Sequence, residues 1–96
     1  GSLTTIPIKP GSATELYVNA ACRDGSRLEA ELIDPKTQQP LVGFSRRQCT
    51  SINSDSLAHR ITWNNRSLPD LKAPYQIRFH FSRGRVSPEL FSLEFR

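Results

Sequence analysis

The 96-residue sequence has no apolar run of about 18 residues, and this absence predicts that it has no membrane-spanning helix. It also has no low-complexity segment, and its 36% hydrophobic and 23% charged residues are typical of a chain that folds. No secretion signal is visible, and the opening Gly1-Ser2 is expected to be the scar of a cleaved expression tag. We therefore expect one domain over residues 3–96, with residues 1–2 outside it, cut from a longer protein.

No segment shows the apolar spacing of an amphipathic helix. Short stretches instead alternate apolar and polar residues, with turn signals between most of them. We expect an all-β fold of about seven short strands, an antiparallel β-sandwich of jelly-roll or immunoglobulin-like order. The expected strands cover residues 4–8, 15–21, 27–33, 41–45, 59–63, 75–81 and 89–95. Asp24-Gly25 is expected to join the second and third of these as a hairpin.

The same alternation assigns side chains to the two faces of each strand. Apolar residues at alternate positions are expected to point into the core. They are Ile61, Trp63, Tyr75, Ile77, Phe79, Phe81, Phe91, Leu93 and Phe95. The intervening residues Gln76, Arg78 and His80 are expected to face outward.

Cysteine is scarce, and Cys22 and Cys49 form no Cys-x-x-Cys pair, so neither zinc nor redox chemistry is favoured. The spacing leaves two states open: one disulfide, which would imply an oxidising compartment, or two free thiols.

The loop aspartates lack the spacing of an EF-hand. Asp24 and Asp55 remain weak candidates for a structural calcium site, with ordinary turn chemistry as the alternative. No other cofactor is expected.

Catalytic motifs are also absent, since no serine lies in a Gly-x-Ser-x-Gly sequence. Glu29 and Glu31 share one face of an expected strand. Glycoside hydrolysis needs two carboxylates across a cleft, one of them desolvated, whereas this pair would stay solvated. A charged outer face is the simpler interpretation, and we predict that the domain is not an enzyme.

Lysine is rare, with only Lys9, Lys36 and Lys72 among 13 basic residues, and the net charge is +4. Arginine, which supplies the rest, forms two-pronged hydrogen bonds with carboxylate, sulfate or phosphate. If strands 59–63 and 75–81 share a sheet, their outward residues form a patch for an anionic glycan. The patch would contain Arg60, Arg78 and His80, with Gln76 and Asn19 as donors to sugar hydroxyls and Tyr17 as a stacking ring.

Two alternatives to this patch stay open. The face could be solvated, with arginine paired to Glu29 and Glu31. A binding site could instead lie in the loop after residue 40, lined by Phe44, Arg46 and Arg47. The competing interpretation is that Phe44 and Trp63 lie in the core. Trp63 stands two residues after Ile61 and is therefore expected to point to the same, inward side of the strand. Nucleic-acid binding is not favoured, because the aromatic residues alternate inward rather than among the basic ones.

Several segments together resemble a known domain type. They are Leu-Tyr-Val-Asn-Ala at 16–20, Leu-Glu-Ala-Glu-Leu-Ile-Asp at 28–34, Leu-Val-Gly-Phe-Ser at 41–45, Cys49, Asp55, Ile-Thr-Trp at 61–63, Leu-Pro-Asp-Leu at 68–71, Ile-Arg-Phe-His-Phe at 77–81 and Leu-Phe-Ser-Leu-Glu-Phe at 90–95. Their order and spacing resemble the C-terminal β-sandwich domain of bacterial secreted carbohydrate-active proteins, which often follows a glycosidase or sialidase-like propeller. The resemblance implies an accessory module of a polysaccharide-degrading protein, located outside the cell, in the periplasm or at the cell surface. It supplies no ligand and no mapped site.

Two functions follow as expectations. The first is a non-catalytic carbohydrate-binding module that holds an attached enzyme at its substrate, an anionic (sulfated or uronic) polysaccharide. The second is a structural domain that packs against its catalytic neighbour and binds no sugar. An open groove with an arginine and a stacking ring would favour the first, and an exposed apolar patch at one edge the second.

Overall fold

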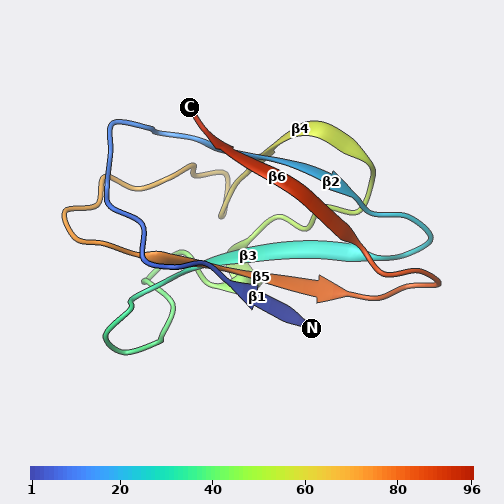
Figure 1. Cartoon of the computed structure of the whole chain (residues 1–96), viewed down its shortest axis with the longest axis horizontal. Helices are drawn as coiled ribbons and strands as arrows, with labels where there is room; N and C mark the ends of the chain where they lie inside the picture. Colours follow the sequence, from blue (N-terminus) through green and yellow to red (C-terminus); the bar gives the residue numbers. More distant parts are fainter.

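A computed structural model describes residues 1–96 and shows six strands and one short helical turn (Figure 1). They are β1 (Ser2–Thr4), β2 (Leu16–Ala21), β3 (Arg27–Ile33), η1 (Arg46–Gln48), β4 (Ser56–Ile61), β5 (Gln76–Ser82) and β6 (Glu89–Phe95). The single 3-10 turn η1 is the only helical segment, and nothing helical here has the length and apolar character needed to cross a membrane.

The strands form two antiparallel sheets, which confirms the predicted β-sandwich with about six strands in place of about seven. The β5 sheet has the order β1-β5-β3 and the β2 sheet the order β4-β2-β6. Figure 1 shows the β2 sheet above the β5 sheet. The core fills the space between them, and its buried members include Leu16, Val18, Leu28, Leu32, Ile61, Ile77 and Phe79. Phe79 points inward and Arg78 outward, as the alternation of this strand predicts.

The predicted hairpin of strands two and three is wrong, because β2 and β3 belong to different sheets. Asp24 and Gly25 do turn the chain, with φ of 51° and 84°. The turn carries the chain across the core rather than back along the same sheet. Leu16 of β2 therefore faces the β5 sheet and Leu28 of β3 faces the β2 sheet, and both are fully buried. Local turn chemistry is the same in the two cases, so the sequence does not distinguish them.

The predicted strand over residues 41–45 is a turn-rich connection, with Gly43 at φ 88°. Its backbone nevertheless pairs with β3, because Leu41 donates to the Leu32 carbonyl at 2.8 Å and Leu32 donates to the Phe44 carbonyl at 3.0 Å. Further along, Leu28 and Ile52 exchange two hydrogen bonds of 2.9 Å. Segment 41–52 thus covers the edge of β3 that β5 leaves free, and an uncovered edge would invite pairing with other chains.

Trp63 completes this covered edge and is fully buried, as its parity with Ile61 predicts. Its Nε1 donates to the Ala30 carbonyl at 2.9 Å, and the Ala30 amide donates to Cys49 Sγ at 3.3 Å. Phe44, also buried, packs edge-on against Trp63 with ring centroids 5.4 Å apart. Both cysteines, Cys22 and Cys49, are buried free thiols.

The prediction that Phe91 points inward is wrong because β6 contains a β-bulge. Asn19 pairs with Ser92 and Ala20 with Leu90, so Phe91 is an extra residue with no partner on β2. Its side chain is 60% exposed, while Leu90 and Leu93 pack against the core. The alternation therefore breaks at one point of the strand, and an aromatic ring reaches the surface there.

A second irregularity lies at the same level of the sheet. Val18 pairs with His59 and Ala20 with Ser56, so two residues of β4, Leu57 and Ala58, stand opposite one of β2. Leu57 is 86% exposed. Both neighbours of β2 thus bulge beside Ala20.

Candidate functional site

The expected patch of Arg60, Arg78 and His80 does not form. Arg60 lies on β4 in the β2 sheet, whereas Arg78 and His80 lie on β5 in the other sheet. The outer faces of two packed sheets point in opposite directions, so these residues cannot bind one ligand on a sheet face. Arg60 pairs instead with Glu15, with 3.1 Å between NH1 and Oε2.

Arg78 and His80 do lie together, but a carboxylate occupies the space between them. Glu31 is only 6% exposed, and its Oε1 is 2.7 Å from His80 Nε2 and 3.6 Å from Arg78 NH1. Arg78 also donates through Nε to the Thr4 hydroxyl at 3.1 Å. The Gln76 amide donates to the Thr5 carbonyl at 2.9 Å. The donors expected to meet a glycan are therefore engaged within the protein.

Arg46 belongs to the same outer face. Its Nε donates to Glu29 Oε1 at 2.9 Å and its NH2 to the Ser82 hydroxyl at 2.9 Å. The Ser51 hydroxyl donates to the other Glu29 oxygen at 2.7 Å. Burial acts to raise the pKa of Glu29, but the hydrogen bonds from Ser51 and Arg46 outweigh it and the pKa is lowered. Arg47, beside Arg46, is exposed and forms no ion pair.

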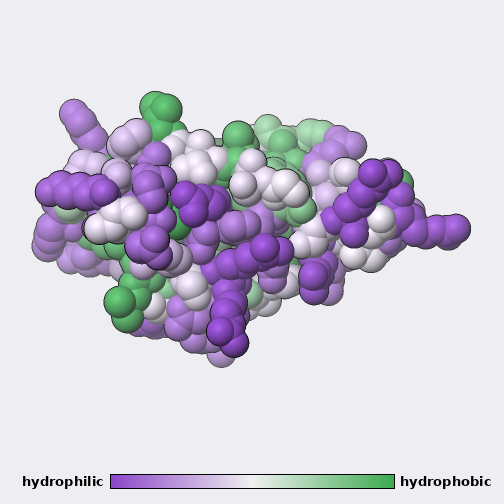
Figure 2. All heavy atoms as spheres, turned by 90° about the horizontal axis from the view of Figure 1, so that it is seen from below, coloured by the Kyte–Doolittle hydropathy of each residue, from purple (hydrophilic) through white to green (hydrophobic).

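This face corresponds to the alternative of arginine–glutamate pairs on a solvated sheet. Figure 2 views the molecule from below, from the side of β1, β5 and β3, and this side is mostly hydrophilic, with hydrophobic residues interrupting it in places. A bound glycan would have to displace Glu29 or Glu31 from its partners to reach the basic groups. Such displacement leaves a poorly solvated carboxylate unpaired, and that is costly.

Tyr17, the expected stacking ring, lies on the outer face of the β2 sheet, between Arg60 of β4 and Glu94 of β6. The Arg96 guanidinium covers it at 4.0 Å from the ring centroid. A guanidinium at this distance interacts favourably with the ring and competes with a sugar for that face.

The two weak calcium candidates have other roles. Asp55 accepts hydrogen bonds from the Cys22 amide at 3.1 Å and from Arg23 Nε at 2.9 Å, and so ties the start of β4 to the end of β2. Asp24 adopts a left-handed turn conformation, and its carbonyl accepts the Arg85 amide at 2.9 Å. No group of three or more potential metal ligands gathers anywhere in the structure.

The two bulges create an open groove on the outer face of the β2 sheet, which we call the bulge groove. Its volume is about 210 Å³. It is lined by Asn19, Ala20, Ala21, Arg23, Asp55, Ser56, Leu57 and Phe91. The groove lies over the backbone of β2 at Ala20 and Ala21, and the exposed Phe91 and Leu57 side chains belong to the strands on either side.

Polar groups in the bulge groove remain available to a ligand. Arg23 uses Nε for Asp55, which leaves its two terminal nitrogens without a partner in the protein. The Asn19 amide and the Ser56 hydroxyl are also free of hydrogen bonds within the chain and line the groove. An exposed ring beside a positioned guanidinium, an amide and a hydroxyl is an arrangement suited to a polar ligand with one apolar face.

Asn19 is predicted from the sequence as a donor, whereas Phe91, Leu57 and Arg23 are not predicted as site residues. A signal was present, because Leu90-Phe91 places two apolar residues in succession within an alternating strand. Such a pair leaves open which of the two residues faces the core, and the bulge gives that position to Leu90 and exposes Phe91. Comparison with protein-family models, with curated proteins and with solved structures finds no match to this chain.

Proposed function

We propose that this domain is a non-catalytic carbohydrate-binding module and that a polysaccharide binds in the bulge groove. The observation that carries the proposal is the Phe91 ring, 60% exposed, on a strand position that would otherwise be buried. It stands beside an arginine with free donors, and this combination is the one expected of a sugar site.

Each part of the groove has a role in this proposal. The C–H face of a sugar ring stacks on Phe91, and Leu57 contacts the opposite edge. The Asn19 amide and Ser56 hydroxyl bond to sugar hydroxyls. The free nitrogens of Arg23 bind a carboxylate or sulfate of the glycan, while Asp55 holds the guanidinium in place. The proposed ligand is therefore an anionic polysaccharide.

The benefit of such a module is effective concentration. A polysaccharide-degrading domain in the same polypeptide stays close to its substrate without new contacts of its own. This role places the domain within a longer secreted, periplasmic or cell-surface protein, as the resemblance implies.

The test is affinity electrophoresis of the 96-residue domain in gels with polygalacturonate, dextran sulfate or neutral hydroxyethyl cellulose. We expect retardation by the acidic polymers that weakens with salt. Phe91→Ala should weaken binding about tenfold or more, the loss typical of a central aromatic contact. Arg23→Gln should weaken binding to the acidic polymers only.

Tyr17→Ala is the matched control, because it removes an aromatic ring from the same sheet face outside the groove. It should leave retardation unchanged. If no polysaccharide retards the wild-type domain at either salt concentration, the proposal is wrong. If Phe91→Ala and Arg23→Gln bind as wild type does, the domain binds sugar at another surface.

One observation favours a second candidate, a structural domain that packs against a catalytic neighbour. Leu57, Phe91 and Val86 are all well exposed, and Phe91 and Val86 line one further hollow beside the groove. Exposed apolar side chains gathered in this way often mark a protein contact. In this case Leu57→Ser would release the domain from its neighbour in the longer polypeptide. The release would be seen as new proteolytic cleavage between the two domains, and adding a glycan would not prevent that cleavage.

A further inference from the structure

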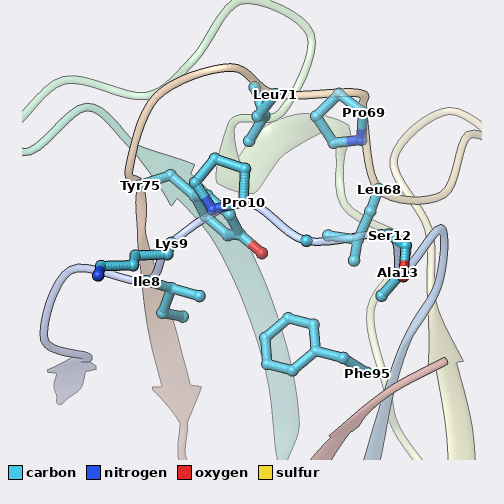
Figure 3. A pocket seen from close by; sticks show the side chains of 11 residues that line it. Ile8, Lys9, Pro10, Ser12, Ala13, Leu68, Pro69, Leu71, Tyr75 and Phe95 are labelled. Carbon is cyan, nitrogen blue, oxygen red and sulfur yellow. The ribbon is translucent and has the colours of Figure 1, made fainter.

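The end of the sandwich opposite the bulge groove carries two adjoining hollows. The first, of about 310 Å³, lies between the segment at residues 8–13, the loop at 68–71 and the last residues of β6 (Figure 3). The second is about 490 Å³. Leu71 and Tyr75 line both, so the two hollows meet at these side chains. We call this region the lysine end.

We infer that the lysine end binds a small ligand with a flat apolar body and an acidic group. The inference goes beyond the proposed function and uses none of the residues of the bulge groove. Volumes of this size match those of small-molecule sites, which are concave, mostly apolar and furnished with few polar groups.

Apolar side chains and proline rings make up much of the walls. The apolar lining residues are Pro7, Ile8, Pro10, Ala13, Pro35, Leu41, Leu68, Pro69, Leu71, Ala73, Pro74, Tyr75 and Phe95. Five of the seven prolines of the chain are among them. Because the proline ring fixes φ, these loops lose little freedom when a ligand binds.

Tyr75 supplies a polar group that is directed into the first hollow. Its side chain is only 6% exposed, and Figure 3 shows its hydroxyl oxygen directed toward the middle of the first hollow. The hydroxyl takes part in none of the side-chain hydrogen bonds of the fold, and burial raises the pKa of the phenol. The hydroxyl is therefore free to form a hydrogen bond with a ligand in the hollow.

The charge of the lining selects an acid. All three lysines of the chain lie here, with Lys9 at the first hollow and Lys36 and Lys72 at the second, and no arginine lines either one. Lys9 and Lys36 form no ion pair, whereas Lys72 pairs with Asp70 at 3.3 Å.

Asp34 also lines the second hollow and accepts the Lys36 amide at 2.9 Å. The region remains positive, since three ammonium groups stand against the carboxylates of Asp34 and Asp70. An ammonium group interacts with a carboxylate as a compact point charge, without demanding the planar fork that arginine presents.

The experiment titrates the domain with 2-naphthoate and with its neutral analogue 2-naphthylmethanol and follows backbone amide shifts by NMR. We expect naphthoate to bind about fivefold more tightly, the effect of one solvated ion pair, and to shift the amides of Tyr75, Leu71 and Phe95. Lys9→Gln with Lys36→Gln should abolish the preference for naphthoate. Tyr75→Phe should weaken both ligands about fivefold through the lost hydrogen bond.

Arg83→Gln with Arg85→Gln is the matched control, since it makes the same change in net charge at exposed positions away from the lysine end. It should leave both affinities unchanged. Equal binding of the two ligands by the wild type, or shifts confined to the bulge groove, would overturn the inference. The lysine changes are at exposed side chains, so they test it even if Tyr75→Phe unfolds the domain. No polysaccharide is used, so this result and that of the carbohydrate test are independent.

Discussion

Replacing Trp63 with phenylalanine tests how the two sheets are held together. The indole Nε1 donates to the Ala30 carbonyl at 2.9 Å in a fully buried position, and the phenyl ring cannot replace that donor. A buried carbonyl without a partner costs about 1–3 kcal/mol. The smaller ring leaves a void of about 40 Å³, which adds about 1 kcal/mol.

The expected loss is therefore about 2–4 kcal/mol, a large part of the roughly 5–14 kcal/mol typical of a domain of this size. It corresponds to a fall in Tm of about 10–25 °C. The assay is urea and thermal unfolding followed by circular dichroism, because Trp63 is the only tryptophan and its loss removes the fluorescence signal.

Tyr17→Phe is the control, since it removes one polar group from a half-exposed aromatic side chain. Its effect should stay within about 0.5 kcal/mol. A loss below about 1 kcal/mol for Trp63→Phe would mean that the covered edge of β3 does not depend on the indole. Segment 41–52 would then close that edge without the hydrogen bond from Trp63 to Ala30.

Three further changes have defined outcomes. Gly84→Ala should lower stability by about 1–3 kcal/mol in urea unfolding, because its Cβ would overlap the backbone of Asp24. The pKa of Glu29 is lower in the folded state than its unfolded value near 4.5, so the stability that this carboxylate contributes is present above pH 4.5 and is lost as the pH falls through the folded pKa. Glu29→Gln should therefore make the free energy of unfolding depend less on pH in this acidic range. Burial raises the pKa of the Cys49 thiol to about 11, so Ellman's reagent at pH 8 should label Cys49 only on unfolding; rapid labelling of the native protein would contradict its burial.

The strand that alternates most strictly is the one that the sequence predicts best. In β5, the inward Ile77 and Phe79 are fully buried, and the outward Arg78 and His80 share the polar outer face. Alternation has a strong physical basis, because a shift of one residue would place every apolar side chain of the strand in water. The core position of Trp63 follows from the same rule.

The partners of each strand could not be predicted in this way. Both the hairpin of β2 with β3 and the shared sheet of Arg60 with Arg78 required knowledge of which strands are neighbours. Alternation states only which side chains face the core, and a sandwich has two sheets that satisfy it equally. Which residues lie together in the candidate site depends on which strands are neighbours, more than on any single residue.

The position of the proposed site follows from how the remaining charges are used. Four of the five glutamates pair with arginine or histidine on the regular parts of the sheets, so these faces are neutralised within the fold. A regular strand gives each side chain a fixed neighbour, which favours such internal pairs. At a bulge the extra residue has no cross-strand neighbour, and its side chain stays available to other molecules. Phe91 and Leu57 are exposed because both strands beside Ala20 bulge at the same level, and binding is therefore expected at this break in the sheet rather than on its ordered faces.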